Sequence, residues 1–92
     1  MPDVRQNVGR HRYEFETEAG DALAFYRLHD NVITFTHTEV PRALRGRGIG
    51  SAMMRAVLTD VRAQGLTVIA ACPFVADYIA RHPEFADLLA RA

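Results

Sequence analysis

The 92-residue sequence has no lysine, no tryptophan and a single cysteine. A lone cysteine excludes an intramolecular disulfide, and with it a secreted disulfide-stabilised scaffold. The apolar runs are too short to span a membrane, and residues 1–10 lack the apolar core of a signal peptide. Eleven basic residues balance eleven acidic ones, which argues against sequence-independent nucleic-acid binding. We therefore expect a cytoplasmic protein with no membrane or nucleic-acid partner.

The absence of lysine also restricts which phosphate site the glycine-rich run can form. A Walker loop needs Lys followed by Ser or Thr, and a dinucleotide fingerprint needs G-x-G-x-x-G. Gly46, Gly48 and Gly50 give G-x-G-x-G instead. The run still joins an apolar segment to an amphipathic one. Glycine amides and a helix N-terminus at such a junction form a cradle suited to phosphate.

The first half of the chain has the pattern of a β-meander within a single small domain, residues 1–92. Strands are expected at Tyr13–Glu16, Ala22–Leu28 and Val32–Val40, where apolar, aromatic and β-branched residues concentrate. Gly20 suits a positive φ in the first turn, and Asp30-Asn31 forms the second. Short turns predict antiparallel neighbours.

The second half has a helical period. Apolar residues between Ser51 and Gln64 lie on one face of a predicted helix that Gly65 ends. The strand Leu66–Cys72 follows, and a right-handed crossover makes it parallel to Val32–Val40. Phe74–Arg81 is predicted to be a short helix, and Pro83 opens a last turn and helix over Glu84–Arg91. The fold class is therefore α+β with an α/β-like C-terminal half.

Three segments together resemble one known family. Arg45-x-x-Gly48-x-Gly50 matches the loop that GNAT acetyltransferases wrap around the pyrophosphate of acetyl-CoA. His37-Thr38-Glu39-Val40-Pro41 precedes it, and Cys72–Ile79 and Arg81–Phe85 follow. The resemblance, from Tyr13 to Leu89, is to a small single-domain branch. It implies a minimal GNAT fold with splayed parallel strands and C-terminal helices, and acetyl-CoA as co-substrate.

The resemblance also implies which residues contact CoA. The amides of Arg45 to Ser51 would bind the pyrophosphate, and Arg42 and Arg47 would add side-chain charge or face solvent. Val40 and Pro73 would flank the splay, where the pantetheine arm pairs with exposed backbone. The implied cofactor-binding set is Val40, Arg42, Arg45, Gly46, Arg47, Gly48, Ile49, Gly50, Ser51 and Pro73.

Acetyl transfer also needs a base for the acceptor amine and a proton for the leaving thiolate. Glu39 lies where some GNAT enzymes place a base, and His37 faces the same side of the strand. Tyr78 lies near the position of a GNAT general acid. Cys72 would lie near the thioester. Each candidate has a structural alternative: a surface carboxylate, a packed histidine, a core aromatic or a buried thiol.

No histidine has metal-ligand spacing with Cys72, so we expect no metal site. The sequence favours an acetyl-CoA-dependent N-acetyltransferase that acts on an unidentified amine by direct transfer. A non-catalytic acyl-CoA-binding module is the alternative, and zero net charge weakens a phosphate- or RNA-binding role. GNAT enzymes carry two helices between their opening strands, whereas the turn Glu18–Asp21 replaces them here. The acceptor site is therefore open, or completed by a homo-oligomer or a partner protein.

Overall fold

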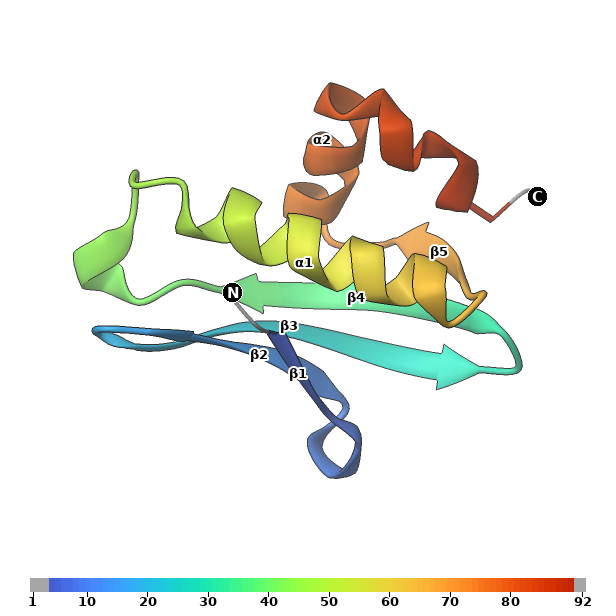
Figure 1. Ribbon diagram of the computed structural model, residues 1–92. Helices are drawn as coiled ribbons and strands as arrows, with labels where there is room; N and C mark the ends of the chain where they lie inside the picture. Colours follow the sequence, from blue (N-terminus) through green and yellow to red (C-terminus); the bar gives the residue numbers. More distant parts are fainter. Residues whose placement is uncertain (1–3, 91–92) are drawn as a thin grey trace.

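A computed structural model describes residues 4–90 of the chain as a twisted sheet with helices on one side (Figure 1). The sheet has five strands in the order β1-β2-β3-β4-β5. Each of the first four strands is antiparallel to its neighbour in the sheet, and β4 pairs with β5 in parallel. This arrangement confirms the predicted meander and the predicted crossover. The strands are β1 (Val4–Asn7), β2 (Arg12–Thr17), β3 (Gly20–His29), β4 (Val32–Glu39) and β5 (Thr67–Ala70).

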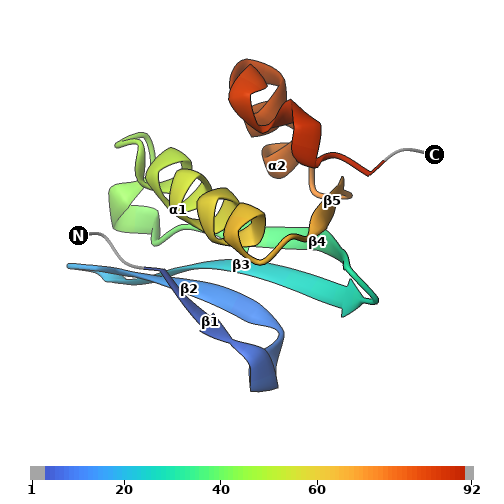
Figure 2. The same cartoon turned by 45° about the vertical axis from the view of Figure 1, so that its right-hand side comes forward.

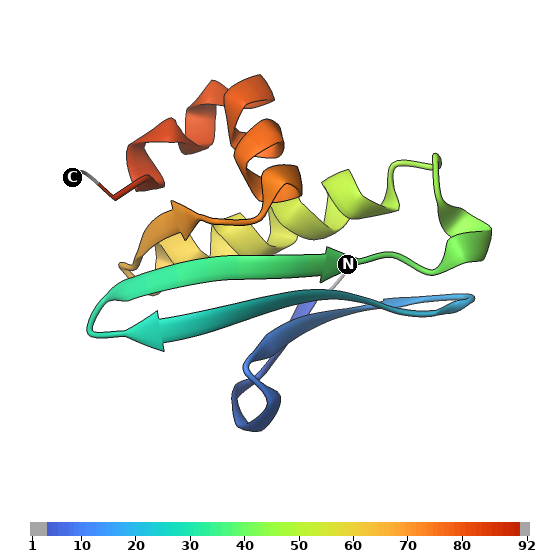
Figure 3. The same cartoon turned by 180° about the vertical axis from the view of Figure 1, so that it is seen from behind.

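The two α-helices and the C-terminal 3-10 helix lie on the same side of the sheet in all three views (Figures 1, 2 and 3). Helix α1 crosses the sheet, and α2 with the C-terminal 3-10 helix stands against α1 near β5. No helix within residues 4–90 has both the length and the apolarity needed to cross a bilayer. The helical elements are η1 (Val8–Arg10), η2 (Arg42–Leu44), α1 (Ile49–Ala63), α2 (Pro73–Arg81) and η3 (Pro83–Leu88).

The turns have the backbone geometry that their residues predict. Gly20 has a φ of 113° at the start of β3, and Asp30 has a φ of 54° between β3 and β4. Gly65, with a φ of 73°, follows the end of α1 in the left-handed conformation. These positions confirm the predicted breaks between elements.

The core lies between α1 and the covered face of the sheet. Met53, Met54, Val57, Leu58 and Val61 of α1 are all fully buried. They pack in one cluster with residues of the covered face that alternate along the strands, among them Tyr13, Ala24, Ile33 and Phe35. The predicted helical face is therefore the face that binds α1 to the sheet.

Some boundaries differ from the predictions. The polar strand β1 was not expected, because Val4–Asn7 carries no alternating apolar pattern. Helix α1 begins at Ile49, so Ser51 lies inside its first turn. The last helix is the 3-10 helix η3, which ends at Leu88 because Ala90 N–H then donates to the Val68 carbonyl of β5 at 2.8 Å. The predicted end at Arg91 lies outside the described residues.

The opposite face of the sheet carries no helix in the part of the chain that the structure describes (Figure 1). Its most buried charge is Glu14, whose carboxylate accepts hydrogen bonds from Asn7, Arg12 and Arg5. These bonds, that from Asn7 foremost, lower the pKa of Glu14 to about 2. The polar cross-strand network satisfies the carboxylate without a covering layer.

Candidate functional site

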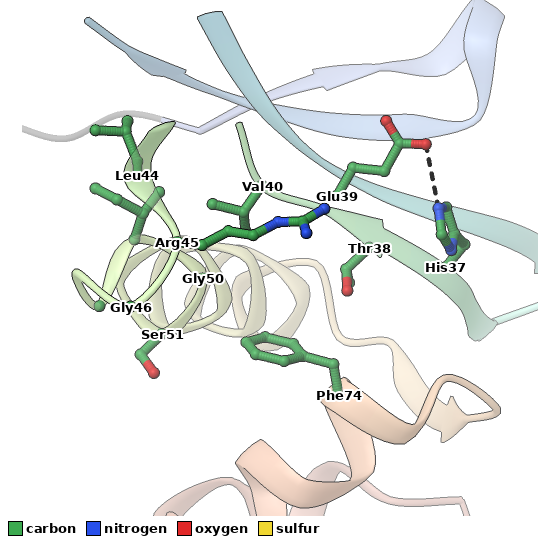
Figure 4. A pocket seen from close by; sticks show the side chains of 12 residues that line it. His37, Thr38, Glu39, Val40, Leu44, Arg45, Gly46, Gly50, Ser51 and Phe74 are labelled. Atoms are coloured by element: carbon green, nitrogen blue, oxygen red, sulfur yellow. Dashed lines mark hydrogen bonds and ion pairs between the residues drawn. The ribbon is translucent and has the colours of Figure 1, made fainter. Parts of the chain in front are cut away.

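A cavity of about 690 Å³ opens where the end of β4, the glycine-rich loop and the first turns of α1 and α2 meet (Figure 4). Most of the predicted cofactor loop therefore lies on one concave surface with both strand-end candidates, His37 and Glu39. The lining residues are His37, Thr38, Glu39, Val40, Leu44, Arg45, Gly46, Gly48, Ile49, Gly50, Ser51 and Phe74.

The cavity exists because β4 continues beyond the point where its parallel neighbour β5 ends. The β4–β5 pairing ends at Phe35 and Ala70, so the strands part earlier than the predicted Val40 and Cys72. The β3–β4 register also shifts there, because Phe25 pairs with His37 whereas Tyr26 pairs with Phe35. From Thr36 on, one edge of β4 has no strand from residues 4–90 beside it. Its backbone amides and carbonyls are thus available to a ligand.

The glycine-rich loop lines this cavity and has backbone donors without a partner among residues 4–90. Gly46 and Gly48 have φ angles of 82° and 77°, a conformation that favours glycine. The amides of Gly46, Gly48, Ile49, Gly50 and Ser51 have no acceptor among the described residues. The sequence predicted that all amides from Arg45 to Ser51 would be free to bind the pyrophosphate. The Arg45 and Arg47 amides already donate to the carbonyls of Arg42 and Leu44 at 3.3 and 3.2 Å.

Three arginines lie in or directly beside this loop. Arg42, Arg45 and Arg47 form no ion pair with any described residue, and all three are exposed. In Figure 4 the Arg45 side chain extends past Val40 toward the end of β4. Arg45 alone of the three lines the cavity. Free guanidinium groups and helix N-terminal amides together favour a multiply charged anion such as a pyrophosphate.

His37 and Glu39 form a polar pair at the end of β4. His37 Nε2 lies 3.1 Å from Glu39 Oε2, and both side chains are more than half exposed (Figure 4). An ionised carboxylate only accepts, so this bond places the imidazole proton on Nε2 and leaves Nδ1 as an acceptor. The Phe25 ring stacks on the imidazole at 5.8 Å. The pair therefore offers a ligand in the cavity a nitrogen that can accept a proton.

The other candidate catalytic residues do not line the cavity. Tyr78 is buried in α2, where its ring stacks on His82 at 3.9 Å, and burial raises its pKa. Cys72 is also buried, although its Sγ lies 3.8 Å from Oγ1 of Thr38, a lining residue. Pro73 begins α2 directly after Cys72. The structure thus brings His37 and Glu39 to the cavity and leaves Cys72 and Tyr78 behind its wall.

Thr38, Leu44 and Phe74 line the cavity and were absent from the predicted site. Alternation along β4 points the Thr38 side chain opposite to His37 and Glu39, toward Cys72. Phe74 had one signal in the sequence, because it is an aromatic residue directly after Pro73, at the start of a predicted helix. Leu44 gave no sequence signal, since it lies in a short 3-10 turn.

Comparisons with known proteins point to one family. A family model described as GCN5-related N-acetyl-transferase matches residues 12–88. Protein NATD1 of Mus musculus is 35% identical over 85 residues, which make up 87% of this chain and 77% of that protein. Protein NATD1 of Homo sapiens is 35% identical over 61 residues, but only 54% of its length is matched.

A solved structure supports the same relationship. The NMR solution structure of a GCN5-like protein from Staphylococcus aureus superposes with a TM-score of 0.72 at 26% identity. The superposition covers 98% of this chain and 89% of the other.

Proposed function

Because this chain belongs to the GCN5-related N-acetyltransferase family, we propose that it binds acetyl-CoA in the cavity and transfers the acetyl group to an amine. The observation that carries the proposal is the set of unpaired amides at Gly46, Gly48 and the first turn of α1. Each amide that donates to a charged phosphate oxygen contributes about 1.5–3 kcal/mol.

Three sets of these residues match three parts of the ligand. The loop amides and Arg45 would hold the pyrophosphate, and Arg42 and Arg47 would add charge for the remaining phosphate. The unpaired edge of β4, from Thr36 to Val40, would take the amides of the pantetheine arm as a strand would. Acetyl-CoA supplies the acetyl group in activated form, as a thioester.

The chain's own contribution to transfer is the movement of protons. An amine is protonated near neutral pH and must lose a proton before its lone pair can attack a carbonyl carbon. His37 Nδ1 is the available acceptor, while Glu39 fixes the tautomer and stabilises the charge on the ring. Thr38 and Cys72 lie on the other side of the strand. Cys72 and Tyr78 remain the predicted candidates for returning a proton to the leaving thiolate, and Thr38 is added to them because it lines the cavity.

One observation favours the alternative of an acyl-CoA-binding module without turnover. The link from β1 to β2 is the single turn η1, and the link from β2 to β3 is shorter still. No element among residues 4–90 therefore builds an acceptor pocket over the open face of the sheet. An acceptor must be held by that open surface or by another molecule.

The test is a pair of measurements on the full-length protein. Isothermal titration calorimetry with acetyl-CoA should show saturable binding. A broad screen of amines with acetyl-CoA, scored by release of free thiol, should show acceptor-dependent turnover. Binding without any acceptor-dependent release would make the binding module the better account. Absence of binding would refute both.

A further inference from the structure

The contact between Phe74 and Gly50 joins the first turns of the two α-helices at the cavity wall. A Cβ atom built on Gly50 would lie 2.7 Å from Cζ of the Phe74 ring, closer than non-bonded carbon atoms approach. Figure 4 shows the ring extending from α2 toward the first turn of α1. The ring therefore occupies space that any residue other than glycine would fill.

Gly50 differs in this respect from the other loop glycines. Gly46 and Gly48 have positive φ angles and nothing within 4 Å of an added Cβ, so their backbone conformation explains the residue type. Gly50 lies inside α1, and its φ is not positive. Glycine is among the least favourable residues within a helix, so a position without a backbone need calls for a packing reason. The Phe74 ring supplies that reason.

We propose that Phe74, seated on Gly50, is the positioning residue for the pantetheine arm of CoA; this inference rests on the proposed function. The ring lines the cavity between the phosphate-binding amides and the unpaired edge of β4. It is 38% exposed, so it offers an apolar surface to a ligand without leaving the protein. Val40, Ile49 and Leu44 provide further partly or fully buried apolar surface on the same cavity.

The chemistry of this wall suits the arm rather than the nucleotide. The arm is a neutral chain of methylene groups interrupted by amides, and it must travel from the loop to the end of β4. An aromatic face stabilises such a chain by excluding water, and it gives nothing to a phosphate. Gly50 then has two separable roles: its amide serves the phosphate, and its missing side chain seats the ring.

The test compares CoA with adenosine 3′,5′-bisphosphate, a nucleotide fragment without the arm, by NMR or calorimetric titration. Phe74→Ala should weaken CoA binding about tenfold, as expected for loss of a partly buried aromatic contact. The same change should leave the affinity for the nucleotide fragment within about twofold. Leu28→Ala is the matched control, since Leu28 is similarly exposed at the far end of β3.

Gly50→Ala tests the seat itself. The added Cβ should displace the ring and weaken CoA about as much as Phe74→Ala, while retaining the amide and the affinity for the nucleotide fragment. In the double variant Gly50→Ala with Phe74→Leu, the shorter side chain accommodates the Cβ, so CoA affinity should match that of Phe74→Leu alone.

Two results would overturn the inference while leaving acetyl-CoA binding intact. One is unchanged CoA affinity in Phe74→Ala. The other is a Gly50→Ala variant that loses both ligands equally, since that result would make residue 50 part of the phosphate cradle only. A wild-type protein that binds neither ligand would refute the proposed function, and this inference with it.

Discussion

The hydroxyl group of Tyr13 in β2 donates a hydrogen bond of 2.6 Å to the carboxylate of Asp60 in α1. Gln64 donates to the same Asp60 oxygen at 2.6 Å and to Gln6 of β1 at 2.9 Å. The end of α1 opposite to the cavity is thus fixed to the sheet by a polar cluster. Burial first, and the bond to Asp60 second, raise the pKa of Tyr13 well above its usual range.

Tyr13→Phe should therefore destabilise the protein. The substitution keeps the buried ring but removes one donor from a partly buried carboxylate, at a cost of about 1–3 kcal/mol in the free energy of unfolding. Urea denaturation measures the change. Tyr26→Phe is the control, because the Tyr26 hydroxyl accepts only a bond from the neutral side chain of Gln6 and should matter less. Equal stability of Tyr13→Phe and wild type would contradict the assigned role.

Gly48→Val should reduce acetyl-CoA affinity at least about tenfold while the domain stays folded. Gly48 has a φ of 77°, which a β-branched residue adopts only with strain, so the loop and its free amides must shift. Calorimetry gives the dissociation constant. Gly65→Val is a matched control at the other end of α1, where φ is 73° and an added Cβ also meets nothing within 4 Å. If the two variants bind acetyl-CoA equally well, the loop is not the phosphate cradle.

Glu39→Gln and His37→Ala should each lower kcat by about 10²-fold or more once a productive amine is known, with acetyl-CoA affinity nearly unchanged. The reason is that both side chains line the cavity and form one hydrogen-bonded pair. Steady-state kinetics at saturating acetyl-CoA measure the effect. Cys72→Ala and Tyr78→Phe provide the comparison. If Cys72→Ala or Tyr78→Phe lowers kcat while Glu39→Gln and His37→Ala do not, the catalytic role belongs to Cys72 or Tyr78 instead.

Glu14 should make the protein more stable at neutral than at acidic pH. Its folded pKa of about 2 lies below the ordinary value of 4.5. The ionised form thus stabilises the fold above about pH 4.5, and this contribution disappears as the pH falls toward about 2. Glu14→Gln should be less stable than wild type at neutral pH, with a difference that shrinks on acidification. Thermal unfolding measured across this pH range checks the prediction, with a Glu16→Gln variant at an exposed position as the control. A stability difference between wild type and Glu14→Gln that does not change with pH would refute the prediction.

Much of the fold could be read from the sequence because local signals and long-range packing agree. Gly20 and Gly65 mark turns that their positive φ angles require, and the apolar stripe from Met53 to Val61 faces the sheet. Strand β1 could not be predicted, because Val4–Asn7 is held by backbone pairing with β2 and by polar bonds such as Arg5 to Glu14. Polar bonds of this kind do not require alternating apolar residues, so they produce no hydrophobic pattern in the sequence.

The site was only partly visible for a related reason. The loop pattern around Gly48 depends on neighbours in the chain, so the sequence displays it. The contact of Phe74 with Gly50 depends on how α2 packs against α1, and the hydrogen bond of Thr38 with Cys72 depends on where β5 leaves the sheet. The same dependence on packing places Tyr78 in the core, although its position in the sequence suggested the thioester.

The parallel pairing of β4 with β5 has a consequence for the order in which the molecule assembles. The hairpins formed by β1, β2, β3 and β4 join segments that are adjacent in sequence. Strand β5, in contrast, is separated from β4 in the sequence by the whole of α1. Contacts between distant segments are costly to close and tend to form late. A half-assembled chain would hold the meander but not the cavity, whose walls come from both halves. A ligand that recognises only the completed cavity would therefore raise the melting temperature, and the rise would follow the logarithm of its concentration once that concentration is well above Kd.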